Sequence, residues 1–289
     1  MIKTIFTTGL LLMVLSVSFA QVPRHKRAYQ LYNGAGKKIT YRKMIRQLAK
    51  SDIILFGELH NNSIAHWLEL ELAKDLVKKE KPLVLGTELI ERDNQLEIDD
   101  YLSGRIDSKA LDTLIRKPIN FNTDYKPLIN FAKAHHIPFV ASNIPRRFAH
   151  IVYMKGFEGL DALSDHEKKW VAPLPIDYDP NLKSYKDMMG MMAGHGGANL
   201  PKAQAIKDAT MAHFILGYFA KGKLFLHYNG AYHSDNYEGI LWYLKKKEPN
   251  LNYKTISVVS QEDISKLAEE SKGVADFIIC VDEDMTTTY

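Results

Sequence analysis

Histidines and carboxylates recur in a short pattern that the sequence contains twice. The segments Gly57-Glu58-Leu59-His60 and Gly230-Ala231-Tyr232-His233 each follow an apolar run and share the form Gly-x-x-His. A third apolar run ends Gly86-Thr87-Glu88 and adds another carboxylate. Two imidazoles with one or two carboxylates suit a borderline divalent metal or general acid–base catalysis. The candidate catalytic residues are Glu58, His60, Glu88 and His233, and the candidate metal ligands are His60, His233 and Glu88.

The elements that must position these residues are predicted to be parallel strands joined by helices. Short apolar runs alternate with longer stretches of helical periodicity, which is typical of a parallel sheet with crossover helices. The predicted strands are Ile53–Phe56, Leu83–Leu85, Phe139–Ala141, Leu224–Tyr228, Ser257–Val259 and Phe277–Val281, and the predicted helices are Ser63–Lys79, Asp124–His135, Lys202–Phe219 and Tyr237–Lys246. The fold class is therefore α/β, with a mainly parallel sheet flanked by helices. Because the carboxyl ends of parallel strands share one edge, both histidines and Glu88 should face one crevice.

The segment from about residue 155 to residue 200 breaks this alternation. It contains Trp170, the proline-bounded stretch Pro173–Pro180 and the methionine-rich run Met188–Met192, with no evident strand pattern. We therefore expect a helical insertion, or lid, over one end of the sheet. His66 and His213 fall within predicted helices, where they could be packed core residues.

The N-terminal residues predict export. Lys3 precedes an uncharged, mainly apolar run, Ile5–Ala20, which ends in the small-residue pattern Ser18-Phe19-Ala20 of a secretory signal peptide. The run is shorter than the ~20 apolar residues that span a bilayer. We expect residues 1–20 to be removed, and residues 21–289 to form one α/β domain with its lid, soluble and periplasmic.

Composition excludes several other classes of protein. With 46% hydrophobic and 25% charged residues, the chain is an ordinary folded protein. The net charge is only +4 and the basic residues are scattered, which argues against a nucleic-acid partner. The single cysteine, Cys280, excludes an internal disulfide and a Cys-rich metal centre. Because no cysteine directly follows the apolar N-terminal run, we expect no lipid anchor there.

Several further short sequence motifs follow one another between about Lys37 and Val259. They are His66 behind the first histidine motif; Glu88 with Arg92 and Gln95; Asn143-Ile144-Pro145; Gln204 with Lys207-Asp208 and Met211-Ala212; and Asn229 at the second motif. In this order they resemble the ChaN-like haem-binding uptake family, within the wider group of TraB/Tiki proteins and erythromycin esterase-like enzymes. The resemblance implies an α/β fold with a helical lid, a surface-associated or periplasmic location, and paired haems in a homodimer, with tyrosine ligation. An outer-membrane uptake system is the partner that such a role implies.

Haem needs a flat apolar slot, an axial ligand and groups that bind its propionates. The lid and the neighbouring strand end contain residues of each kind. The candidate axial ligands are Tyr178, Tyr185 and His195, the candidate apolar walls include Met188 and Met192, the candidate propionate partners are Arg146 and Arg147, and Asp208 and Asn229 are added through the family motifs. Methionines at helical spacing can equally be ordinary packing.

The Tiki relatives imply a different activity, metal-dependent hydrolysis. On this chain it would use the two Gly-x-x-His motifs, through His60 and His233, and the glutamate Glu88. An erythromycin esterase-like version would need no metal, because a histidine and a glutamate can activate water directly. We therefore expect an exported haem-binding protein in haem or iron uptake or handling, and retain a metal-dependent protease or esterase as the alternative. A noncatalytic partner-binding protein would explain the signal peptide but not the paired motifs.

Overall fold

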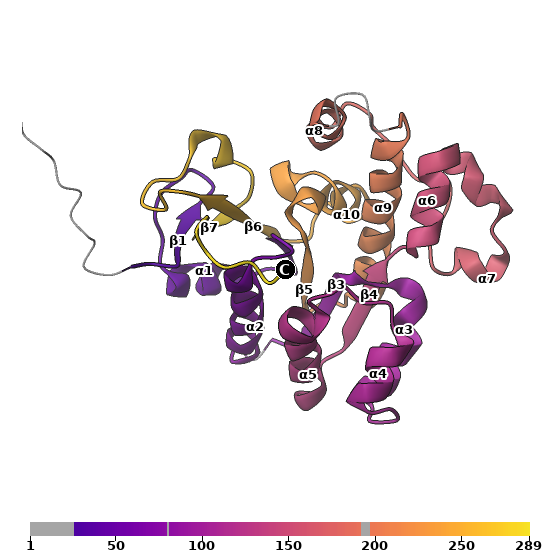
Figure 1. Ribbon diagram of the computed structural model, residues 1–289, viewed down its shortest axis with the longest axis horizontal. Helices are drawn as coiled ribbons and strands as arrows, with labels where there is room; N and C mark the ends of the chain where they lie inside the picture. The colour runs from indigo at the N-terminus through magenta and orange to yellow at the C-terminus, as the bar shows by residue number, and fades with distance from the viewer. Residues whose placement is uncertain (1–25, 80, 192–196) are drawn as a thin grey trace, which may run out of the picture.

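The computed structural model describes residues 26–79, 81–191 and 197–289, and its strands form one seven-stranded sheet (Figure 1). The strands are β1 (Tyr29–Asn33), β2 (Ile53–Glu58), β3 (Leu83–Glu91), β4 (Phe139–Asn143), β5 (Leu224–Gly230), β6 (Tyr253–Gln261) and β7 (Phe277–Asp282). Their order in the sheet is β1-β7-β6-β2-β5-β3-β4. Neighbouring strands are parallel except β1 and β7, so the predicted mainly parallel α/β fold is confirmed.

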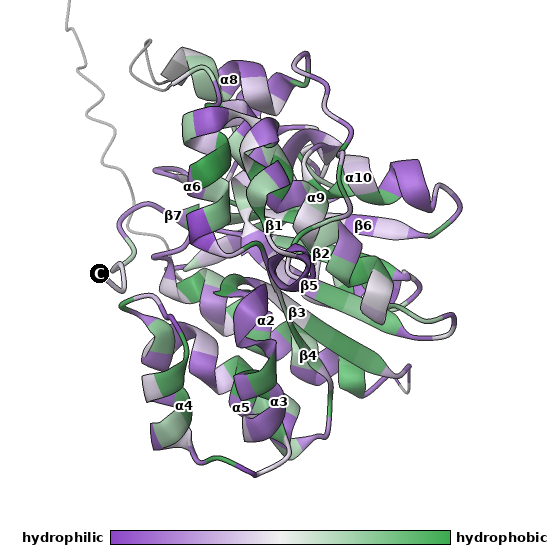
Figure 2. Ribbon diagram, turned by 90° about the vertical axis from the view of Figure 1, so that its right-hand side faces the viewer, coloured by the Kyte–Doolittle hydropathy of each residue, from purple (hydrophilic) through white to green (hydrophobic). Residues whose placement is uncertain are grey.

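Helices cover both faces of this sheet. They are α1 (Tyr41–Leu48), α2 (Ser63–Val77), α3 (Gln95–Leu102), α4 (Ser108–Leu114), α5 (Lys126–Ala134), α6 (Arg146–Lys155), α7 (Asp165–Lys168), α8 (Lys183–Met191), α9 (Leu200–Tyr218) and α10 (Ile240–Lys247). Buried residues of α1 to α5 share one hydrophobic core with one face of the sheet, and those of α9 and α10 share another with the opposite face. The apolar strands lie between these layers (Figure 2).

The central strands explain this layering. All residues of β2 and β5 are buried, as expected of strands covered on both faces. Since side chains alternate along a strand, Ile54 and Phe56 face the core with α1 to α5, whereas Ile53 and Leu55 face α9 and α10. The six predicted strands are present, each longer than predicted by one to six residues.

Some helix boundaries differ from the sequence prediction. The helix expected from Tyr237 begins only at Ile240, because Tyr237 and Gly239 both have positive φ angles, which interrupt a right-handed helix. At Gly239 a Cβ atom would lie 2.3 Å from the carbonyl oxygen of His233, so this close approach requires glycine. The helix expected from Asp124 begins at Lys126, after a π-helical turn over Phe121–Tyr125.

The sequence interpretation missed β1 and the helices α1, α3, α4 and α6. Strand β1 is a short antiparallel edge strand that pairs with β7, and only two of its five residues are buried. Helix α1 has a recognisable start, since the Thr40 hydroxyl accepts a hydrogen bond from the backbone N–H of Lys43. Its buried face contains Met44, Ile45 and Leu48.

The segment predicted as a helical insertion contains helices and no strand within its described residues. Helix α6, the 3₁₀ turn Phe157–Ala162 and the start of α9 enclose a separate small core, which includes Phe148, Leu160 and Ile206. In Figure 1, α6 lies beside α9, α7 lies on the outer side of α6, and α8 lies at the top of the molecule. His195 and Met192, like the predicted signal peptide, lie outside the described residues. Among the described helices, none is long and apolar enough to cross a membrane.

Candidate active site at the carboxyl edge of the sheet

Strands β2 and β5 bring the two histidine motifs side by side. They are parallel neighbours in a register that pairs Gly57 with Asn229 and Glu58 with Gly230. His60 follows β2, and His233 ends the 3₁₀ turn Ala231–His233 that follows β5. Glu88 comes from β3, on the other side of β5. We call His60, Glu88, Asp208 and His233 the rim site; Asp208 reaches it from α9.

His60 is the solvent-facing member of the rim site. Its side chain is 46% exposed, and its Nδ1 lies 2.6 Å from Oε1 of the buried Glu58. A Cβ atom on Gly230 would lie only 2.9 Å from the His60 ring, so glycine leaves the room that the imidazole occupies. The bond to Glu58 raises the pKa of His60 and fixes the ring through Nδ1, while Nε2 lies beside Gly230.

His233 lies deeper, between two carboxylates. Its Nδ1 is 2.5 Å from Oδ1 of Asp208 and its Nε2 is 3.0 Å from Oε1 of Glu88. Oε2 of Glu88 accepts a hydrogen bond of 2.7 Å from the backbone N–H of Gly230. Gln204, one turn before Asp208 on α9, also contacts the imidazole. Both rim histidines are thus held at Nδ1 by a buried carboxylate.

The charges of these groups are strongly coupled. Burial alone would lower the pKa of His233, but Glu88 and Asp208 raise it to about 9. Burial would raise the pKa of Glu88, yet the charges of His233 and His60 hold it below its ordinary value. Burial raises the pKa of Asp208, although His233 opposes this effect. At neutral pH the rim site therefore contains an imidazolium clamped between carboxyl groups, beside the accessible imidazole of His60.

The rim residues do not have the compact spacing of a three-residue metal site. Within the described residues, the cluster whose ligand atoms all lie within 4.8 Å of one another is instead Glu58, His66 and Glu69. The rim arrangement suits acid–base chemistry, because His60 can exchange a proton with a bound water or substrate. Both ring nitrogens of His233 contact carboxylates, so His233 positions Glu88 and Asp208.

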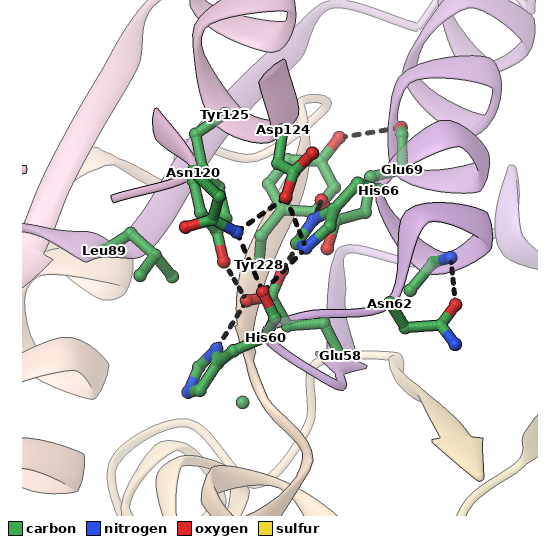
Figure 3. A network of polar contacts seen from close by, with 12 residues as sticks. Glu58, His60, Asn62, His66, Glu69, Leu89, Asn120, Asp124, Tyr125 and Tyr228 are labelled. Atoms are coloured by element: carbon green, nitrogen blue, oxygen red, sulfur yellow. Dashed lines mark hydrogen bonds and ion pairs between the residues drawn. The ribbon is translucent and has the colours of Figure 1, made fainter. Parts of the chain in front are cut away.

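Glu58 connects the rim site to a buried polar network (Figure 3). Its Oε1 accepts a hydrogen bond of 2.7 Å from the Tyr125 hydroxyl as well as contacting His60. The Asn120 side-chain amide donates to the His60 carbonyl at 2.9 Å and to the Asp124 carboxylate at 2.6 Å. This network fixes the backbone and side chain of His60 from behind.

The candidate haem residues of the insertion lie around α8 and α6. Tyr178 and Tyr185 stack with ring centroids 5.6 Å apart, and Tyr185 is buried near Asp208. Burial raises the pKa of the Tyr185 phenol, which opposes the tyrosinate form that binds iron. Met188 is half-buried on α8.

The two arginines and Asn229 have more local contacts. Arg146 is exposed at the start of α6, whereas Arg147 bonds Asp93 at 2.7 Å and packs over the rings of Phe148 and Trp170. The buried Asn229 amide donates to the Gly230 carbonyl and the Ser234 hydroxyl, which holds the turn after β5. The structure therefore brings the tyrosines together near Asp208 and gives Arg147 other partners.

Two features were missed from the sequence. His66 is buried, as expected, but it pairs with Glu69 one turn along α2, and a His–Glu pair on the buried face of a helix was an available signal. The expectation that His213 is a packed core residue is wrong, because His213 is exposed on α9. It lines a hollow of about 310 Å³ next to a larger one of about 710 Å³.

Comparison with known proteins agrees with this α/β architecture. Residues 44–244 match the profile of the family described as haem-binding uptake, Tiki superfamily, ChaN. The chain belongs to this ChaN family.

Similar solved structures support the fold. ChaN of Campylobacter jejuni, described as binding haem cofacially, superposes with a TM-score of 0.65 at 16% identity, over 87% of this chain and 96% of that one. The erythromycin esterase EreC superposes with a TM-score of 0.52 at 9% identity, over 91% of this chain and 99% of that one. At these identities the likeness concerns the fold alone.

A curated relative is the chloroplast protein RETICULATA-RELATED 5 of Arabidopsis thaliana, 24% identical over 170 residues. The match covers 54% of this chain but only 23% of the plant protein.

Proposed function

We propose that this chain binds haem and acts in haem or iron uptake or handling. Membership of the ChaN family supports haem as the ligand class, and the structural likeness to Campylobacter ChaN supports a common scaffold. A hollow beside α9 supports the proposal with particular residues. It combines an apolar wall, an imidazole and an ammonium group.

This hollow has the chemistry that a haem site requires. Its apolar wall consists of Ala172, Pro173, Pro175, Ile176, Ala209, Ala212 and Leu216. His213 and Lys247 line it together, as do Tyr243 and Asp177. The hollow has a volume of about 310 Å³ and adjoins the larger hollow of about 710 Å³. The two share the lining residues Ala172–Pro173 and Pro175–Ile176. A planar apolar ligand can lie against this wall with its acidic edge toward Lys247.

His213 suits axial ligation because its imidazole is neutral. Partial desolvation of the ring against the hollow, together with the charges of Arg92 and Lys247, lowers its pKa, so that the ring nitrogen keeps its lone pair at neutral pH. When bound, haem supplies an iron centre whose reactivity depends on this ligand. Tyr178 is the competing ligand, since its ring packs edge-on against Phe157 of the larger hollow at 5.5 Å. The roles of Tyr185, His195, Met188, Met192, Arg146 and Arg147 in haem binding stay predictions.

The proposal includes a location and an assembly. Removal of residues 1–20 would release residues 21–289, as one α/β domain with its helical lid, to the periplasm. Cofacial binding, as described for Campylobacter ChaN, requires two haems face to face, which a homodimer of this chain would supply.

The first test is a titration of the purified protein with haem, followed by the Soret absorbance. We expect saturation at a defined ratio with a spectrum typical of one axial ligand, because the hollow provides a limited number of sites. An unrelated protein of similar charge is the control, since haem adsorbs to apolar surfaces. Weak binding that never saturates would contradict the proposal.

The rim site supports a second candidate function, hydrolysis of a carbonyl substrate. The specific observation is that His60 and His233 are each held at Nδ1 by a carboxylate and flank Glu88. His60 would act as the base for water, and the Glu88 carboxylate, held in place by His233, would orient that water.

A hydrolytic activity would be lost on changing either histidine. We expect His60→Ala and His233→Ala each to reduce hydrolysis of a p-nitrophenyl ester by at least about 100-fold, the size of one general acid–base contribution. Circular dichroism would check folding. The same activity in the wild type and both variants would show that the rim site is not the hydrolytic centre.

A further inference from the structure

Behind the rim site lies a buried cluster of Glu58, His66 and Glu69, which we call the inner cluster (Figure 3). Glu58 ends β2, while His66 and Glu69 lie one turn apart on α2, whose first turn packs against that strand end. Their side chains are at most 3% exposed. One nitrogen, Nδ1 of His66, faces both carboxyl groups.

The spacing in the inner cluster is wide for ion pairs and suited to a metal. Nδ1 of His66 lies 3.2 Å from Oε2 of Glu69 and 3.4 Å from Oε2 of Glu58. A charge-assisted hydrogen bond would contract to about 2.7–2.9 Å. Ligands at about 2.0–2.2 Å from a tetrahedral Zn²⁺ ion lie about 3.3–3.5 Å apart, close to the observed distances.

Two carboxylate oxygens of the cluster have no hydrogen-bond partner among the described residues. They are Oε2 of Glu58 and Oε1 of Glu69, on side chains that are almost completely buried. A buried carboxylate oxygen without a donor is costly, so the two side chains need either a cation or a shared proton between them.

The surrounding charges do not supply that cation. Within the described chain, the ion-pair partners of Glu58, Glu69 and Asp124 are only the histidines His60 and His66. Three carboxyl groups thus share two imidazoles.

We propose that Glu58, His66 and Glu69 bind one divalent transition-metal ion such as Zn²⁺ behind the rim site. One imidazole nitrogen with two carboxylate oxygens is a ligand set that favours Zn²⁺ over Mg²⁺. The ion would reach the cluster past His60, the half-exposed side chain that shares Glu58. Bound there, the ion would fix Glu58 and so orient His60. This proposal is independent of haem binding.

The test compares zinc binding by wild type, Glu69→Gln and His233→Ala. The chelator-treated protein is titrated with ZnCl₂, with MgCl₂ as the selectivity control, and zinc content and melting temperature are measured. Wild type and His233→Ala should each take up one Zn²⁺ per chain and melt at a higher temperature with zinc. Glu69→Gln, which keeps the side-chain size, should do neither and should remain folded in chelator.

Other outcomes would overturn the proposal. If wild type takes up no stoichiometric zinc, a shared proton fills the space between the two carboxyl groups. If His233→Ala abolishes uptake while Glu69→Gln retains it, the ion lies at the rim site. Anomalous scattering at the zinc edge from wild-type crystals needs no variant, and its peak must lie between Glu58, His66 and Glu69.

Discussion

Replacing Asp208 with Ala should lower the free energy of unfolding by about 3 kcal/mol at pH 7, measured by denaturant unfolding in the presence of chelator. Asp208 is fully buried on α9 and lies 2.5 Å from Nδ1 of His233. Breaking a buried ion pair by removing one partner costs about 3–5 kcal/mol. The lower value applies because Glu88 still pairs with His233 in the variant.

The matched control is Asp177→Ala. Asp177 pairs with Lys246 at 3.2 Å, but its side chain is 55% exposed, so its loss should cost less than about 1 kcal/mol. Equal effects of the two substitutions would mean that the ion pair of His233 does not stabilise the fold.

The effect of Asp208→Ala should also depend on pH. His233 has a folded-state pKa of about 9, above its ordinary value of 6.5. A raised histidine pKa stabilises the folded state fully below about pH 6.5, and this stability is lost as the pH rises through about 9. The difference between wild type and Asp208→Ala should therefore shrink from pH 6.5 to 9.5. A difference that is constant over this range would rule out a charged His233 as its source.

The sequence predicts the sheet better than it predicts the polar clusters, for a physical reason. Strands β2 and β5 each begin with an apolar run because both faces are covered, and the Gly-x-x-His segments at their ends identify the shared edge. The edge strand β1 lacks such a run, since it is half-exposed and paired on one side.

Long-range partners are invisible in the local pattern. Asp208 meets His233 only because α9 packs on the sheet, and Tyr125 meets Glu58 only through the π-helical turn before α5. His213 shows the converse error. Its position within a predicted helix suggested a core residue. It lies instead at the edge of the apolar face of α9, where it lines the hollow beside the loop over residues 171–177.

His213→Ala should weaken haem binding at least about tenfold and change the Soret spectrum, because His213 lines this hollow. The loss of an axial ligand removes a direct iron bond, and about 1.4 kcal/mol corresponds to each tenfold change in affinity. Stability should change little, because His213 is exposed. The measurement is a haem titration of both proteins with matched melting curves.

Two further variants test whether the effect on haem binding is specific to His213. His150→Ala, an exposed histidine on α6 that does not line the hollow, should bind haem as wild type does. Tyr178→Phe should also keep the wild-type spectrum, since the ring that packs on Phe157 is retained and only the phenol oxygen is lost. If Tyr178→Phe instead changes the spectrum while His213→Ala does not, the iron lies in the larger hollow. The neutral imidazole of His213 would then have no part in ligation.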